Sequence, residues 1–383
     1  MSFYAATQPT SLKTSYSSND IVDFNVQPKP GRSILPGSFR FSGEIGIQVQ
    51  ATTGGAWRPI EELDYINVDA FAGVHSIIRS INTQVNARTI ENTQLYPRIV
   101  AMMRQATNTL GSLNTDSTLL SEMCGTVNRF QLLGTRSTSV NASSYKMASF
   151  SILPMNCLNL ASAPLSQTQF GNIQMSFTLA DAIECFYTSR KSTDLYFSGA
   201  KSYNNIRYVV VNPQLDWVEV AGTSSAPITM PVKELFQQTI SSSSSYLNIT
   251  CPALYNAVSM SFLAQSKANS LFHNNYGCDK LLGIDEQGSV EILINSADTI
   301  IPYPILTYQE VSLNYLKSLN GNMGKNVILN QAMSDAMSFG IGFAMLTSSF
   351  DRVAVNLKIN PDSYAGLIPQ TDAFIYTNSF VQI

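Results

Sequence analysis

The sequence is poor in charge for its length. Charged residues make up 13% of the 383 residues, about half the share that is usual in soluble domains. The 23 basic and 26 acidic side chains nearly cancel and gather into no basic patch, so we expect no sequence-specific binding of nucleic acid. A polar but uncharged surface loses little free energy when it is desolvated, which suits extensive contacts between subunits.

The sequence also lacks a long apolar run and a cysteine framework. The longest apolar stretch, around residues 338–346, is far shorter than the roughly 20 residues that span a bilayer, and the first four residues lack the regions of a signal peptide. Five scattered cysteines form no C-x-x-C pair, which predicts buried free thiols in a reducing compartment. They are Cys124, Cys157, Cys185, Cys251 and Cys278.

Residues for catalysis are scarce. The two histidines, His75 and His273, each stand alone among predicted strand or loop residues, so neither predicts a triad or a metal site. The segment Gly321–Lys325 has two residues between its glycines, where a phosphate-binding loop needs four. We therefore predict no catalytic, cofactor-binding or metal-ligating residue, and no enzyme. The loop carboxylates that could seat calcium are interpreted as solvated: Glu61, Glu62, Asp64, Asp69, Asp279, Asp285 and Glu286.

What the sequence does contain is alternation of apolar and polar residues. This period of two runs through residues 39–49, 173–179 and 353–359, and it predicts strands with one buried face. Weaker patterns predict further strands at 21–26, 74–85, 145–153, 206–211 with 217–220, 257–264, 290–295, 339–346 and 373–383. The pattern indicates an all-β protein.

Three segments predict helices. Pro97 opens a run that ends at Gly111, and Pro304 opens another that ends at Asn320. Proline in the first turn and glycine or asparagine after the last turn are typical of helix ends. The stretch 231–238 is a shorter third candidate.

Two features occur twice in the same order. Residues 76–82 lead through Ile90 to Tyr96-Pro97, and residues 289–295 lead through Ile300 to Tyr303-Pro304. The alternating stretch 170–179 is likewise echoed by 350–359. Together these echoes indicate a duplicated domain.

We therefore predict two tandem eight-stranded jelly-roll barrels with a few short helices in loops, an arrangement that hides sheet edges. The expected divisions are an N-terminal arm at 1–20, a first barrel at 21–222 and a second barrel at 223–383. The linker is expected near Gly222–Pro227.

These sequence features resemble those of a known protein family. The strand, hairpin, Tyr-Pro step and helix in each half, and the late segment 339–346 followed by 350–359, resemble the double jelly-roll major capsid proteins of tailless icosahedral viruses. The compact length is similar to that of the smaller capsid proteins in this family, which come from membrane-containing bacteriophages.

This resemblance implies a structural protein of the virion, synthesised and assembled in the host cytoplasm. It implies a homotrimer whose six barrels form a pseudo-hexagonal capsomer. The implied partners are neighbouring capsomers, minor or penton capsid proteins and, as in the membrane-containing members, an internal membrane beneath the shell. The arm at 1–20 and the C-terminal end at 380–383 are the expected contact segments.

Two other functions remain open at this stage. A carbohydrate-binding, receptor-binding or vertex β-sandwich protein would share the low charge but should expose an aromatic sugar platform, for which Trp57 and Trp217 are the only tryptophans. A β-sandwich glycosidase is the third alternative, because paired carboxylates are close in space rather than in sequence.

Overall fold

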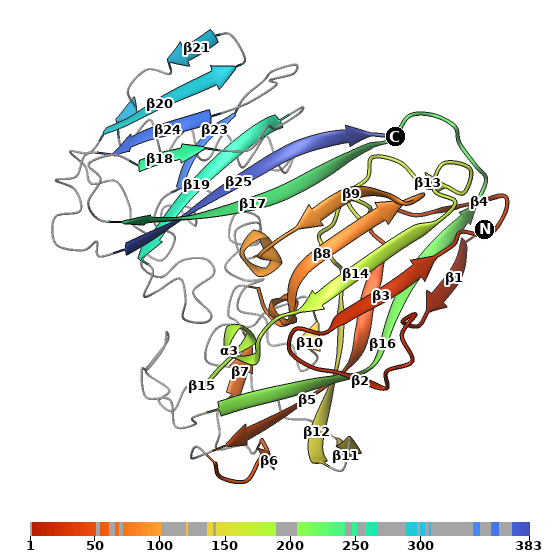
Figure 1. Cartoon of the computed structure of the whole chain (residues 1–383). Helices are drawn as coiled ribbons and strands as arrows, with labels where there is room; N and C mark the ends of the chain where they lie inside the picture. Colours follow the sequence, from red (N-terminus) through yellow and green to blue (C-terminus); the bar gives the residue numbers. More distant parts are fainter. Residues whose placement is uncertain are drawn as a thin grey trace. The chain divides into compact units, whose positions relative to one another are not determined.

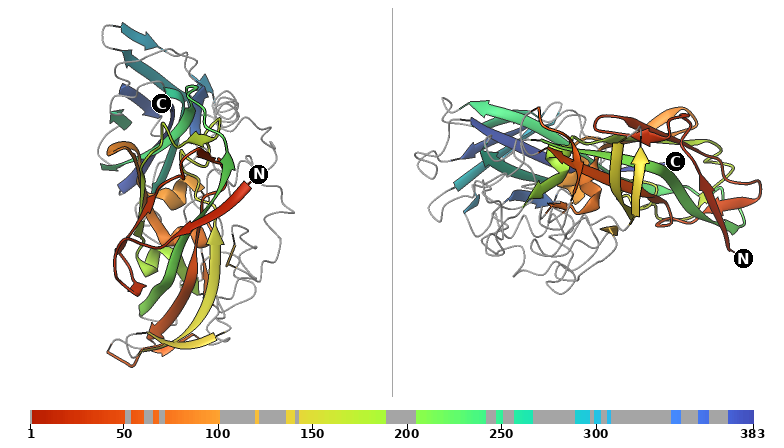
Figure 2. Two further views of the ribbon diagram at one scale, coloured as in Figure 1. Left: turned by 90° about the vertical axis from the view of Figure 1, so that its right-hand side faces the viewer. Right: turned by 90° about the horizontal axis from the view of Figure 1, so that it is seen from below.

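The computed structural model describes residues 2–50, 54–60, 66–68, 72–100, 120–121, 136–140, 143–188, 205–241, 247–250, 257–266, 289–296, 299–302, 306–307, 340–344, 354–359 and 370–383. The chain divides into two units (Figures 1 and 2). Unit 1 comprises Met1–Ala101, Asn108–Met230 and Gln382–Ile383, and unit 2 comprises Met102–Thr107 and Pro231–Val381.

The first sheet of unit 1 joins strands from both ends of that unit. Its order is β1 with β2, then β16, β5 and β12, and each neighbouring pair is antiparallel. The bounds are Ser2–Thr7 for β1, Ser15–Tyr16 for β2, Arg40–Gln50 for β5, Ser143–Ile152 for β12 and Asn205–Ala221 for β16.

The second sheet of unit 1 has the order β3-β14-β8-β9. Its strands are β3 at Ile21–Val26, β8 at Ile78–Val85, β9 at Arg88–Thr93 and β14 at Ile173–Leu179. Counting β1 and β2 as one strand, the first sheet contains strands one, eight, three and six, and the second contains two, seven, four and five. This is the order of a jelly roll, in which two Greek keys fold into one sandwich.

Unit 2 repeats the same order. One sheet runs β17-β25-β19-β23 and the other β18-β24-β20-β21, which again places strands one, eight, three and six opposite two, seven, four and five. The bounds are Thr229–Ser241 for β17, Leu247–Thr250 for β18, Ala257–Ser266 for β19, Ser289–Ser296 for β20, Thr299–Pro302 for β21, Gly340–Ala344 for β23, Ala354–Ile359 for β24 and Gln370–Gln382 for β25. The two echoes in the sequence are therefore equivalent strands: β8 matches β20, and β14 matches β24.

Short elements extend this frame in both units. They are β4 at Arg32–Ile34, β6 at Arg58–Pro59, β7 at Ile66–Val68, β10 at Leu120–Ser121, β11 at Arg136–Val140, β13 at Leu165–Ser166, β15 at Phe186–Thr188, β22 at Leu306–Thr307, the 3-10 helix η2 at Val74–Ile77 and α3 at Ala182–Cys185. The continuation of the sheet by β4, which pairs with the last residues of β16, lengthens the barrel beyond β5.

The core of unit 1 lies between its two sheets and is built on phenylalanine. Phe41 of β5 stacks on Phe177 of β14, with ring centroids 4.8 Å apart and an interplanar angle of 11°. Phe24 of β3 meets both rings edge-on at 5.9 Å, and Phe150 of β12 meets Phe41 at 5.3 Å. Offset and edge-on pairs of this kind stabilise a core beyond the apolar area that they bury.

Two of the three predicted helices contain residues that form strands instead. The segment 231–238 was predicted to be helical, but it lies inside β17. Leu306 and Thr307, in the helix predicted after Pro304, form β22 against β20. Residues 96–100 are helical as predicted, and the remainder of that run lies outside the described residues. Pairing with a distant strand outweighs local propensity at β17 and β22.

A glycine on β5 allows a second apolar layer to pack on the face of the sheet opposite Phe41. Gly46 pairs with Met147 and Val209, and these two side chains form a buried cluster with Tyr145 and Val211. A Cβ atom on Gly46 would lie 2.6 Å from the Met147 sulfur and 2.9 Å from the Tyr145 Cβ. The layer therefore requires a residue without a side chain at this position.

We expect Gly46→Ala to destabilise unit 1 by about 1 to 3 kcal/mol through overpacking. The measurement is urea unfolding of the full chain. Ser149→Ala, at an exposed position of the neighbouring strand, is the matched control and should change stability by no more than about 0.5 kcal/mol. Equal effects of the two substitutions would contradict the close packing at Gly46.

Candidate functional site

The N-terminal residues form one edge of the first sheet. Residues 2–7 pair antiparallel with residues 215–220 of β16 in an unbroken register from Ser2–Val220 to Thr7–Leu215, and β1 lies at the margin of unit 1 (Figure 1). Within the predicted N-terminal arm at 1–20, residues 2–7 and 15–16 form strands β1 and β2 of the first sheet. Strand β1 reads Ser-Phe-Tyr-Ala-Ala-Thr, and because its two aromatic residues are adjacent, no alternation between its faces could be recognised.

An arginine holds the start of β1 in place. The Arg32 guanidinium lies 3.6 Å from the centroid of the Phe3 ring, a cation–π contact, and its Nη1 lies 3.2 Å from Oε2 of Glu219. Glu219 is 1% exposed, and its other oxygen accepts a hydrogen bond from Trp217 Nε1 at 3.1 Å. The buried carboxylate is thus compensated by one cation, and that cation anchors Phe3.

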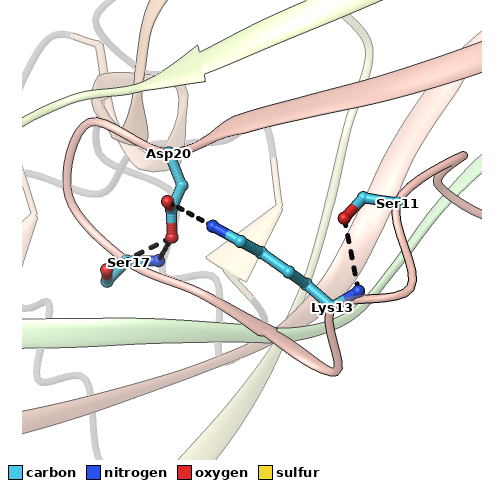
Figure 3. A network of polar contacts seen from close by, with 4 residues as sticks. All are labelled: Ser11, Lys13, Ser17 and Asp20. Atoms are coloured by element: carbon cyan, nitrogen blue, oxygen red, sulfur yellow. Dashed lines mark hydrogen bonds and ion pairs between the residues drawn. The ribbon is translucent and has the colours of Figure 1, made fainter.

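A polar network connects the loop before β2 with the turn between β2 and β3 (Figure 3). Lys13 Nζ lies 2.7 Å from Oδ1 of Asp20, and the Ser17 backbone N–H donates to Oδ2 of Asp20 at 2.8 Å. Partial burial raises the pKa of Asp20, but the hydrogen bonds and charge of Lys13 and the hydrogen bonds from Ser17 outweigh it and leave the pKa below its usual value. Beside this network, Tyr16 of β2 is 1% exposed and fixes the second half of the strand in the core.

Exposed apolar side chains are concentrated in this part of unit 1. Tyr4 is 71% exposed, Leu12 is 100% exposed and Ile21 is 54% exposed. Partial desolvation and a hydrogen bond to the Asp216 carboxylate raise the pKa of Tyr4 to about 12, so the phenol stays neutral. Together, β1, the loop at 8–14 and the start of β3 define a neutral, partly apolar surface, which we term the β1 edge.

A second polar feature lies inside the barrel. Glu91 of β9 is 2% exposed and accepts hydrogen bonds from the Cys157 backbone N–H at 3.1 Å and from the hydroxyls of Thr83 and Thr93 at 3.3 and 3.2 Å. None of these partners carries a positive charge. Burial raises the pKa of Glu91 to about 7, although the hydrogen bonds act in the opposite direction. Burial and the nearby Glu91 also raise the pKa of the Cys157 thiol.

Comparisons with known proteins identify the fold. No family model matches the sequence, and no curated protein matches it. Solved structures do match over the whole chain. The Faustovirus major capsid protein has a TM-score of 0.61 at 6% identity, covering 100% of this chain and 90% of that one. The mavirus major capsid protein has a TM-score of 0.54 at 10% identity, covering 99% and 90%.

This chain has the double jelly-roll fold of the viral major capsid proteins. A quasi-atomic model of the PBCV-1 virus capsid agrees, with a TM-score of 0.53, 10% identity and coverage of 100% and 94%. At these identities the likeness concerns the fold, and it confirms the prediction of an all-β chain with two jelly rolls.

The described part of the double jelly roll includes His75 and two of the five cysteines. His75 is fully buried in η2, and its Nδ1 lies 2.8 Å from the Tyr96 hydroxyl. Because that hydroxyl also accepts the Met155 backbone N–H at 2.9 Å, it links three segments of the jelly roll. Cys157 and Cys185 are buried thiols, as predicted. His273, Gly321–Lys325, the seven loop carboxylates and the other three cysteines lie outside the described residues.

In the described ranges, no group of three or more potential metal ligands comes together, and none of the helices has the length and apolar character that a membrane span requires.

The two tryptophans do not form a shared platform for a sugar. Trp217 is 5% exposed, and its ring packs against Phe39 at 6.4 Å in the core. Trp57 is half-buried, and the Arg207 guanidinium covers one face of its ring at 4.4 Å. The double jelly roll thus uses one tryptophan in its core and the other to hold the turn after β5 against β16.

Proposed function

We propose that this chain is the major capsid protein of an icosahedral virus. The observation that carries the proposal is the occurrence of two complete jelly rolls with the same strand order in one chain. The similar structures that match over the whole chain are named as major capsid proteins or virus capsids. The low charge of the sequence fits a protein that buries much of its surface against other subunits.

The proposed assembly is a homotrimer in which six jelly rolls form a pseudo-hexagonal capsomer. The proposed partners in the virion are neighbouring capsomers, minor or penton capsid proteins and an internal membrane beneath the shell. Synthesis takes place in the host cytoplasm. The role is structural, with no catalysis and no sequence-specific binding of nucleic acid.

The two ends of the chain remain the proposed contact segments. The β1 edge supports this role for residues 1–20 because it combines Tyr4, Leu12 and Ile21 in exposed positions. At the other end, Ile383 exchanges two backbone hydrogen bonds with Ile228, the residue after the predicted linker, at 2.9 and 3.1 Å. Residues 380–383 therefore have a fixed position and can form part of a contact surface.

The experiment that tests the proposal is negative-stain electron microscopy of the purified chain, together with its mass by light scattering. Hexagonal particles with three-fold symmetry and the mass of three 41.9 kDa chains are expected. Monomers, or dimers without that outline, would contradict the capsid role. Binding or cleavage on a glycan panel would then favour the receptor-binding or glycosidase alternative.

A further inference from the structure

The outer face of the second sheet of unit 1 carries uncharged polar side chains across all four of its strands, β3, β14, β8 and β9 (Figure 1). Successive residues of a strand point to opposite faces of a sheet. The outward residues form two rows whose members are all half-buried or exposed. The first row consists of Asp23, Ser176, Asn82 and Asn92, and the second consists of Asn25, Gln174, Gln84 and Thr89.

These two rows carry almost no charge. Asp23 is the one charged residue in them, and the exposed arginines of this sheet, Arg79 and Arg88, lie outside the rows at the beginnings of β8 and β9. Amide and hydroxyl side chains each offer both a hydrogen-bond donor and an acceptor. Such a face can therefore bind an identical face, whereas a charged face would repel its own copy.

We propose that this outer face packs against the same face of a second copy of this chain in a neighbouring capsomer, across a two-fold axis that runs along the strands. This inference rests on the proposed capsid function. In the proposed capsomer the strands stand roughly perpendicular to the shell, so the radial two-fold axes between capsomers have this direction. Two sheets related in this way keep their strands aligned, which is one of the common geometries of sheet packing.

The rows are complementary to themselves under this rotation. A two-fold axis that runs along the strands, between β14 and β8, exchanges the two sides of the sheet and keeps each residue at its own height. Strand β14 then faces β8 of the copy, so Ser176 faces Asn82 of the copy and Gln174 faces Gln84 of the copy. Each of these contacts joins groups that can both donate and accept, as a contact between identical surfaces requires.

The charged residue of the rows also meets a donor. Asp23 and Asn92 stand at opposite ends of the first row, so the rotation brings Asn92 of the copy to Asp23. Gln94 Nε2 donates to Oδ1 of Asn92 at 2.8 Å, which occupies the Asn92 oxygen and leaves its amide N–H groups as donors. A carboxylate that is desolvated in a contact needs such a donor.

The same self-complementarity places the contact between capsomers. A three-fold axis within a trimer brings two different surfaces of the chain together, and such a contact does not require a face that fits itself. A two-fold axis does require it, and an icosahedral shell has two-fold axes between its capsomers.

The first test is a cross-link across the proposed axis. Sheets packed face to face lie about 10 Å apart, which is too far for a disulfide, so Asn82→Cys is assembled into shells and treated with a short bismaleimide. A covalent dimer is expected on a denaturing gel. The wild type, with its five native cysteines, and Ser224→Cys, on the exposed linker, are the controls and should give no dimer.

Treatment of isolated Asn82→Cys trimers with the same reagent distinguishes the two kinds of contact. No dimer is expected before assembly, because the proposed contact joins different trimers. A dimer within isolated trimers, or shells of Asn82→Cys without a dimer, would overturn the inference while leaving the capsid role intact.

The second test places a charge on the face with little change in its shape. Asn82→Asp should still form trimers, because Asn82 is on the outward side of β8, but its shell yield should fall about tenfold or more, since two like charges meet near the axis. Ser224→Asp adds the same charge on the exposed linker and should assemble like the wild type. If Asn82→Asp forms shells as well as Ser224→Asp does, the inference is wrong. Failure of the wild type to form trimers would instead overturn the capsid role and this inference together.

Discussion

Replacing Phe41 with alanine is expected to lower the free energy of unfolding of unit 1 by about 3 to 5 kcal/mol. Phe41 is fully buried on β5 and contacts aromatic rings from three other strands, β3, β12 and β14. Truncation removes the stacked pair with Phe177 and leaves a cavity between the two sheets. The surrounding rings are themselves held by backbone pairing, so they can fill that cavity only in part.

Tryptophan fluorescence during urea unfolding gives a direct reading of this loss. The chain has two tryptophans, and both Trp57 and Trp217 belong to unit 1, so the signal follows the jelly roll that contains Phe41. Phe41→Leu is the control and should cost less than Phe41→Ala, because it retains most of the side-chain volume. A loss below about 1 kcal/mol for Phe41→Ala would show that the ring cluster does not hold the sheets together.

Strands in which apolar and polar residues alternate, strongly or weakly, could be predicted from the sequence. The predicted limits 21–26 and 173–179 coincide with β3 and β14, since an apolar residue at every second position specifies one buried face. The segment 206–220 was predicted as two pieces and is the single strand β16, whose pairing with β5 is irregular between Val211 and Gln214. A bulge of this kind interrupts the pattern without ending the strand.

Elements that depend on distant partners could not be predicted in the same way. Strand β1 has a weak pattern of its own and is specified by β16, more than 200 residues later in the chain. At β17, Pro231 followed by Lys233 and Glu234 resembles the first turn of a helix, whereas the strand is specified by β25. Local propensity is too weak to decide between these outcomes when a partner strand is available.

The polar site at Glu91 has no signature in the sequence for the same reason. Its donors come from β8, from β9 and from the segment that follows β12, with Cys157 lying 66 residues away. A single glutamate in an alternating strand is normally placed on the solvent face. The structure instead directs Glu91 inward, next to a backbone N–H and two hydroxyls, and a carboxyl group in such a place binds its proton more tightly than one in water.

Stability of unit 1 is therefore expected to decrease as the pH rises toward neutrality, and Glu91→Gln should remove this decrease. The folded-state pKa of Glu91, about 7, lies above its ordinary value of 4.5, so the folded chain binds a proton that the unfolded chain has released. The contribution is fully present below pH 4.5, is lost as the pH rises through about 7, and amounts to about 3 kcal/mol.

Glutamine resembles the protonated carboxyl group in shape and charge, so the variant should match the wild type near pH 5 and exceed its stability near pH 8. The measurement is urea unfolding of both chains across this pH range, again followed by tryptophan fluorescence. The titratable group that faces Glu91 is the Cys157 thiol, whose raised pKa keeps it neutral throughout, so the difference between the two curves reports on Glu91. Parallel curves for the two chains would show that Glu91 does not hold a proton in the folded jelly roll.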